Sequence, residues 1–145
     1  MKLLSNDLRN GSEMPSEFTC EGSDISPELH WAGVPSGAKS FAIILRDPDA
    51  PSGDFAHWLV CNIPASAASI PKGGPLPKGA VQVVNDFGKK AYGGPCPPSG
   101  THRYVFRLYA LGVESVDCGS KQQFLQAVEQ HKIGEAALLA PYKRK

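Results

Sequence analysis

The sequence predicts an all-β fold, and three observations lead to this prediction. Thirteen prolines and fifteen glycines break the 145 residues into short segments, which favours strands and tight turns over long helices. The apolar segments between these breaks have the length of strands, and only one stretch shows clear helical spacing. The length is that of a single domain over residues 1–145, which is large enough to bury a core without the help of disulfides or metal ions.

Two segments have the pattern of long core strands. Phe41–Leu45 is continuously apolar between charged and turn-forming residues, so we expect a strand that is covered on both faces and lies in mid-sheet. Arg103–Leu111 alternates, which places Tyr104 on one face with every second residue after it. His102 precedes this strand and is expected on the same face as Tyr104.

A third strand is expected at His57–Ile63, which is rich in residues that suit a pleated surface. Strict alternation would place His57, Leu59 and Cys61 on one face. Trp58 would then point to the opposite face and pack in the core.

One helix is indicated near the end of the chain. Ser120 and Gln123 form a capping box, and the apolar residues that follow recur at helical spacing, so a helix is expected from about residue 121 to about residue 131. Residues 135–140 also favour helix by propensity. The glycine before them and the proline after them leave little room for one.

Composition excludes several classes of partner. Fifteen Lys and Arg residues against fourteen Asp and Glu residues leave a net charge of +1, so no global field favours nucleic acid or an anionic membrane. The first residues become polar too early for a secretory signal, and no later segment has the pattern of a transmembrane span. A cytoplasmic location is therefore expected.

The cysteines show no pattern of metal binding or redox catalysis. Cys20, Cys61, Cys96 and Cys118 have neither paired zinc-ligand spacing nor a C-x-x-C motif. Scattered reduced thiols are the expectation that fits a cytoplasmic protein, and no cofactor is indicated.

Titratable residues cluster at predicted strand ends beside loops that proline stiffens. Asp47 and Asp49 directly follow the most apolar strand, His57 opens another strand, and His102 follows a second loop rich in proline and glycine. Buried polar groups need partners, so we expect these side chains to meet one another. The Ala50–Pro51 bond in the first loop is expected to be cis.

These blocks, in this order, resemble the phosphatidylethanolamine-binding protein family, and most closely its short prokaryotic branch that is similar to Raf-kinase inhibitors. The blocks are Asp47-Pro48-Asp49-Ala50-Pro51, His57-Trp58, and Gly94-Pro95 through His102-Arg103-Tyr104, with Thr19 to Pro27 and His30-Trp31 before them. The resemblance implies a Greek-key sandwich of two antiparallel sheets with one short helix near the C-terminus. It also implies that residues 135–140 form a strand.

The resemblance further implies an anion pocket at one end of the sandwich. Its ligand-binding residues would be Asp47, Asp49, His57, His102 and Tyr104, with Gly94 and Pro95 shaping the rim. The expected ligand is a phosphate-type or carboxylate small anion, such as a phospholipid head group. The roles known in the family imply a macromolecular partner as well, namely a kinase or protease that the protein inhibits. Related short members of the family are often dimers, so a homodimer is among the expected assemblies.

The chemistry of the residues agrees with an anion site. Two imidazoles can donate to an anion while Asp47 sets their tautomers and favours their charged forms, so binding is expected to be best near or below neutral pH. Arg103 alternates to the other face, so a structural ion pair is expected for it.

Two enzymatic alternatives stay open at this point. His57, His102 and a carboxylate are a donor set that a catalytic metal could use. Alternatively, Ser99 or Cys96 could be a hydrolase nucleophile with His102 as its base. We prefer a binding protein without catalytic residues, because neither candidate nucleophile lies in a strand-to-helix elbow.

Overall fold

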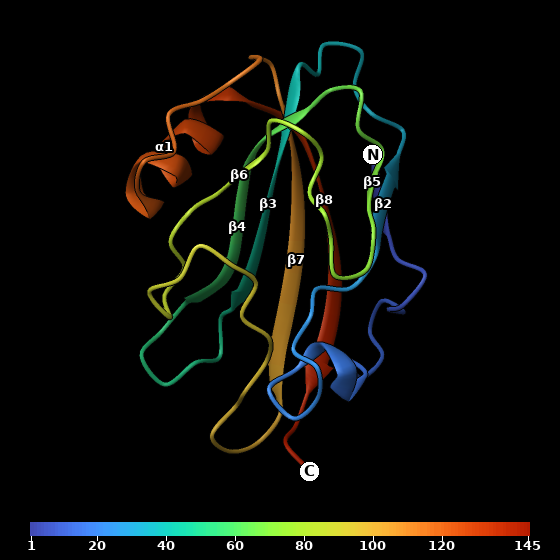
Figure 1. The fold of residues 1–145 in the computed structure, drawn as a ribbon, viewed down its shortest axis with the longest axis vertical. Coiled ribbons are helices and arrows are strands. Elements are labelled where there is room, and N and C mark those ends of the chain that lie inside the picture. Colours follow the sequence, from blue (N-terminus) through green and yellow to red (C-terminus); the bar gives the residue numbers. More distant parts are fainter.

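A computed structural model describes residues 1–145 and contains two antiparallel sheets, with one α-helix near the C-terminus, as the sequence predicted (Figure 1). The smaller sheet has the order β1-β2-β5, formed by Lys2–Leu4, Leu29–Ala32 and Ser69–Ile70. The larger sheet has the order β6-β4-β3-β7-β8, formed by Val81–Gln82, Phe55–Pro64, Ser40–Asp47, His102–Leu111 and Lys132–Tyr142. A short 3₁₀ helix, η1, covers Ser16–Phe18, and α1 covers Lys121–His131.

Strand β3 is the centre of the larger sheet, which confirms the expectation for the apolar segment 41–45. Its alternate residues Phe41, Ile43 and Leu45 face the core between the two sheets. Ala42 and Ile44 face the opposite side, where they join a second core cluster. Residues 41–45 are all apolar because both faces of the strand are covered there.

Strand β7 also shows the predicted alternation. Tyr104, Phe106, Leu108 and Ala110 belong to the core between the sheets. Tyr109 and Leu111 belong to the second cluster on the outer face. His102 and Tyr104 lie on the same face, and their rings stack with centroids 6.3 Å apart.

Helix α1 begins where the capping signal predicted. The Ser120 hydroxyl accepts a hydrogen bond from the Gln123 backbone N–H at 3.2 Å. Phe124 and Val128 then pack on the outer face of the larger sheet, on the side away from β2 and β5 (Figure 1). No helix of the structure has the length and apolar character needed to span a membrane.

Residues 135–140 lie in β8, as the resemblance implied. Helix propensity is overridden here because β8 pairs with β7 along nearly its whole length, from Lys132 opposite Leu111 to Tyr142 opposite His102. The inward-facing Leu138 and Ala140 join the core between the sheets.

The predicted face of His57 is wrong, and a β-bulge is the reason. Leu45 pairs with Trp58, whereas Arg46 pairs with Ala56, so His57 has no partner on β3. Leu59 lies in the outer core cluster, as the alternation predicted, but the His57 ring packs against Tyr104, 5.4 Å between centroids. A bulge inserts one extra residue and turns its side chain away from the regular alternation.

The cysteines are paired, which corrects the expectation of reduced thiols. Cys20 is bonded to Cys96, and Cys61 is bonded to Cys118. These pairs join segments 76 and 57 residues apart, so no local spacing motif reveals them. Disulfides are usual in oxidising compartments, and the cysteine pattern therefore no longer supports a cytoplasmic location.

The expected cis bond at Ala50–Pro51 is also wrong. The cis proline of the structure follows Gly74, in the segment that leads from β5 to β6. In the loop after β3, Gly53 has a φ of 99° and its N–H donates to the Ala50 carbonyl at 2.9 Å. Glycine adopts this left-handed conformation without strain, so the loop turns without a cis peptide.

We expect Trp58→Ala to lower the free energy of unfolding by about 3–5 kcal/mol, because the change removes a fully buried aromatic side chain. Trp58 is 2% exposed and lies in the core between the sheets. Asp47→Asn should cost less, since it keeps the size of the side chain. Chemical denaturation of both variants tests this, with Phe87→Ala as an exposed aromatic control. A larger loss in Asp47→Asn than in Trp58→Ala would contradict it.

Removal of either disulfide should lower the free energy of unfolding by about 2–4 kcal/mol, because each one closes a long loop in the unfolded chain. The test is denaturation of Cys20→Ala/Cys96→Ala and of Cys61→Ala/Cys118→Ala. Thiol titration of the unfolded protein without reductant should detect no free cysteine. Titration of free thiols in that sample would show that the pairs do not form.

Candidate functional site

The candidate site lies where three neighbouring strands meet at one end of the larger sheet. Asp47 ends β3, His57 lies near the start of β4, and His102 starts β7. Antiparallel pairing brings these three ends together, at the lower end of Figure 1. They open on a cavity of about 300 Å³ lined by Asp47, Ala50, Pro51, Ser52, Phe55, His57, Phe87, Cys96, Pro97, Pro98, His102 and Tyr104.

Asp47 and His102 form a buried hydrogen-bonded pair. His102 Nδ1 lies 2.6 Å from Asp47 Oδ2, and the two residues are 7% and 2% exposed. The other carboxylate oxygen accepts the Asp49 backbone N–H at 2.8 Å. Asp47 therefore holds the ring of His102 and the start of the following loop at the same time, and His102 Nε2 remains for a ligand.

His57 is held by a backbone carbonyl. Its Nδ1 lies 2.7 Å from the Gly93 carbonyl oxygen, and its ring meets the rings of Phe55 and Phe87 edge-on at 5.0 and 5.1 Å. Burial lowers the pKa of His57 below its usual range, although the Gly93 carbonyl and the Asp47 charge oppose this shift. Asp47 favours the charged form of His57, as expected, but burial outweighs this effect, so a charged His57 is not favoured overall.

Tyr104 forms the floor between the two histidines. Its ring stacks on His102 and meets the His57 ring at a nearly perpendicular angle of 87°. Burial raises the pKa of Tyr104 far above its usual range, and the Asp47 carboxylate adds to this shift. The phenol therefore stays protonated and is a neutral donor at the cavity.

Asp49 is turned away from the cavity, although the sequence placed it among the ligand-binding residues. Its carboxylate accepts from Arg103 Nε at 2.9 Å and from a terminal guanidinium nitrogen at 2.7 Å. These hydrogen bonds hold the pKa of Asp49 well below its usual range. The structural ion pair expected for Arg103 is confirmed, and it ties the loop after β3 to the start of β7.

Gly94 and Pro95 lie behind the cavity wall rather than on its lining. The Gly94 N–H donates to Asp24 Oδ1 at 2.8 Å, and the Pro95 carbonyl accepts from the Cys20 N–H at 3.1 Å. A Cβ on Gly94 would lie 2.3 Å from both the Phe18 carbonyl oxygen and Asp24 Oδ1. Glycine is needed here because two backbones approach each other closely.

Several cavity residues were not recognised in the sequence. Phe87 is an aromatic side chain of the cavity lining that is 45% exposed, and it lies outside the signature blocks, seven residues before Gly94. Cys96 and Pro97 do lie within a signature block, but nothing local showed that they line the site. An exposed aromatic residue in a loop is a weak signal, and only the fold shows what it faces.

The two enzymatic alternatives find little support in the geometry. No group of three His, Cys, Asp or Glu side chains is spaced to hold a metal ion. Cys96 is bonded to Cys20 and is not a free thiol nucleophile. Ser99 does not line the cavity that contains His102.

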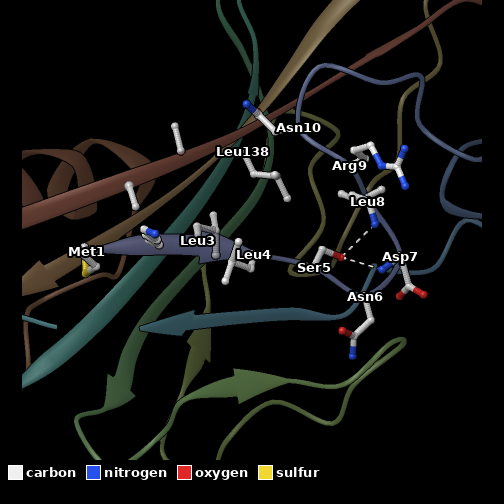
Figure 2. Close-up of a pocket in the computed structure, with 13 residues that line it drawn as sticks. Met1, Leu3, Leu4, Ser5, Asn6, Asp7, Leu8, Arg9, Asn10 and Leu138 are labelled. Carbon is white, nitrogen blue, oxygen red and sulfur yellow. Dashed lines mark hydrogen bonds between the residues drawn. The ribbon is translucent and has the colours of Figure 1, made fainter. Parts of the chain in front are cut away.

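A larger groove of about 670 Å³ lies elsewhere, between β1 and β8 (Figure 2). Residues 1–10 and 136–138 line it, and Ser5 Oγ there accepts from the backbone N–H groups of Asp7 and Leu8. It contains no histidine or tyrosine and is open to solvent along two strand edges. The smaller cavity is the better candidate because a buried carboxylate and two buried imidazoles converge on it.

The chain is similar to one sequence family along nearly all of its length. A family described as phosphatidylethanolamine-binding protein matches residues 4–143. A UPF0098 protein of Methanothermobacter thermautotrophicus is 48% identical over 150 aligned residues, covering 99% of each chain. A UPF0098 protein of Aquifex aeolicus is 43% identical and is covered over 89% of its length.

Two solved structures share the fold. YbcL of Escherichia coli, described as a new member of the mammalian PEBP family, superposes with a TM-score of 0.94 at 37% identity, with 99% and 98% of the chains covered. CT736 of Chlamydia trachomatis, described as a homologue of phosphatidylethanolamine-binding protein, gives a TM-score of 0.91 at 35% identity, with 99% and 97% covered.

We expect His57 to titrate below the usual histidine pKa of about 6.5. NMR titration of the ring Hε1 protons in phosphate-free buffer measures this, with His57→Gln to assign the signal. Because the unfolded chain then binds the proton more readily, the protein should lose stability as the pH falls below about 6.5, and His57→Gln should reduce this loss. A His57 titration above the usual value would contradict the burial argument.

Proposed function

We propose that this chain, which belongs to the phosphatidylethanolamine-binding protein family, binds small phosphate-type anions in the cavity between Asp47, His57 and His102. The observation that carries the proposal is the buried Asp47–His102 pair, whose free ring nitrogen is left for a ligand. Burying a carboxylate and an imidazole costs free energy unless their polar atoms find partners, and a bound anion would be such a partner for His102 Nε2.

The size and lining of the cavity suit a head group. A volume of about 300 Å³ is at the small end of ligand pockets and accommodates a phosphate group with a short substituent. The walls of the cavity are apolar and are formed by Phe55, Phe87, Pro51 and Pro97. Its titratable groups therefore lie only at the strand ends. A free phospholipid head group that ends in a phosphate monoester, such as phosphorylethanolamine, fits the same arrangement.

We propose binding rather than catalysis. Donors and charge come from His102, Tyr104 and Asp47. Of the possible nucleophiles in the lining, Cys96 is in a disulfide, and Ser52 has no base hydrogen-bonded to its hydroxyl. Inhibition of a kinase or protease would use the same cavity, since a phosphorylated or acidic side chain carries the anion that it accepts. We further infer a single domain, because one core between the sheets extends over strands from both ends of the chain.

Affinity for phosphate or phosphorylethanolamine should fall about 10- to 100-fold in His102→Ala, because a hydrogen bond from a charged ring is lost. Asp47→Asn should act in the same direction, since it removes the charge that favours an imidazolium. Isothermal titration of both variants tests this, with His131→Ala, on α1, as the control. Unchanged affinity in both cavity variants would place the anion site elsewhere.

A further inference from the structure

Both histidines of the cavity use the same ring atom to contact the protein. His102 Nδ1 contacts the Asp47 carboxylate and His57 Nδ1 contacts the Gly93 carbonyl. Neither acceptor can donate, so each Nδ1 carries the hydrogen of the contact. Each Nε2 therefore carries a proton only when its ring is an imidazolium.

Both Nε2 atoms face open space. No side-chain polar atom in the structure is fully buried without a hydrogen-bond partner. The hydrogen bonds of the two rings are made through Nδ1, and both residues line the cavity. A ligand in the cavity thus meets two ring nitrogens whose protonation decides whether they donate or accept.

The two rings differ in how readily they hold a second proton. His102 touches a carboxylate, which stabilises an imidazolium far more than a neutral carbonyl does. The groups that face His57 are the carboxylates of Asp47 and Asp24, the phenol of Tyr104, and the Gly93 and Gly94 carbonyls. Burial against three aromatic rings outweighs their effect and lowers its pKa. His57 is therefore the ring that resists a second proton.

In the singly protonated state the cavity offers one donor, His102 Nε2–H, and one acceptor, His57 Nε2. We propose, building on the anion site proposed above, that the cavity selects oxyanions that carry a proton of their own over fully deprotonated ones. Hydrogen phosphate and the monoanion of a phosphate monoester can accept from His102 and donate to His57 together. Sulfate has no proton at neutral pH, so its oxygen would face the lone pair of His57.

Phosphate and sulfate make a matched pair for the test. Above neutral pH both are tetrahedral dianions of similar size, but hydrogen phosphate keeps one hydroxyl. Phosphate can therefore bind while His57 is neutral, whereas sulfate binding requires His57 to take up a proton from the solvent. Any effect of His102 titration applies to both anions and cancels in the ratio of their affinities.

The experiment is isothermal titration of inorganic phosphate and of sulfate between about pH 7 and pH 9. We expect phosphate to bind about tenfold or more tightly at the lower end, because an unmatched acceptor is costly. The preference for phosphate over sulfate should then grow about tenfold for each unit by which the pH rises, as one linked proton requires. In His57→Gln the ratio should approach one and lose its pH dependence, because an amide can donate or accept. His131→Gln should leave it unchanged.

The outcomes separate this inference from the proposed function. If both anions bind with equal affinity at every pH, and binding still depends on His102, the selection is overturned and the anion site stands. If neither anion binds to the wild-type protein, the proposed function fails and this inference fails with it.

A second measurement does not depend on a folded variant. The ring ¹⁵N shifts of His57 in the wild-type protein should report a neutral Nδ1–H tautomer when phosphate is bound. They should report an imidazolium when sulfate is bound at saturating concentration. An imidazolium with both anions would overturn the inference.

Discussion

The pairing of β3 with β4 on one side and β7 on the other is the constraint on which the site depends. Because both partners run antiparallel to β3, the end of β3 lies beside the starts of the other two strands. The register cannot slip by one residue, since a slip would exchange the two buried faces of β3. Asp47 therefore reaches His102 across 55 positions of sequence at 2.6 Å.

Within that frame, one irregularity sets the chemistry. The bulge at His57 frees its carbonyl from the ladder with β3, and that carbonyl accepts from Asn85 Nδ2 at 3.0 Å and from the Gly93 N–H at 3.1 Å. Gly93 in turn accepts from the His57 ring. Gly93, at the start of the second proline-rich loop, thus binds the His57 backbone and also orients the His57 ring. Both histidines donate through Nδ1, but one donates to a charged carboxylate and the other to a neutral carbonyl.

The wall of the cavity also depends on the N-terminal segment. Cys20 is bonded to Cys96, Asp24 accepts the Gly94 N–H, and the Phe18 carbonyl accepts the Tyr92 hydroxyl at 2.7 Å. These contacts hold the loop before β7 from behind, and none of residues 18–24 lines the cavity. Mutations in residues 18–24 should therefore be read first as changes in the shape of the cavity.

The sequence by itself determined the positions of the long strands, the capped helix and the polar strand ends, because hydrophobic period and turn residues are local properties. Its signature blocks also pointed to the family. The face of His57, the pairing of the cysteines and the partner of Asp49 were decided by tertiary structure alone. Each of these depends on a contact between segments distant in sequence: a bulge against β3, loops closed over 76 and 57 residues, and an arginine on a different strand. Local patterns do not report such contacts, because the free energy that decides them comes from packing and hydrogen bonding in the assembled fold.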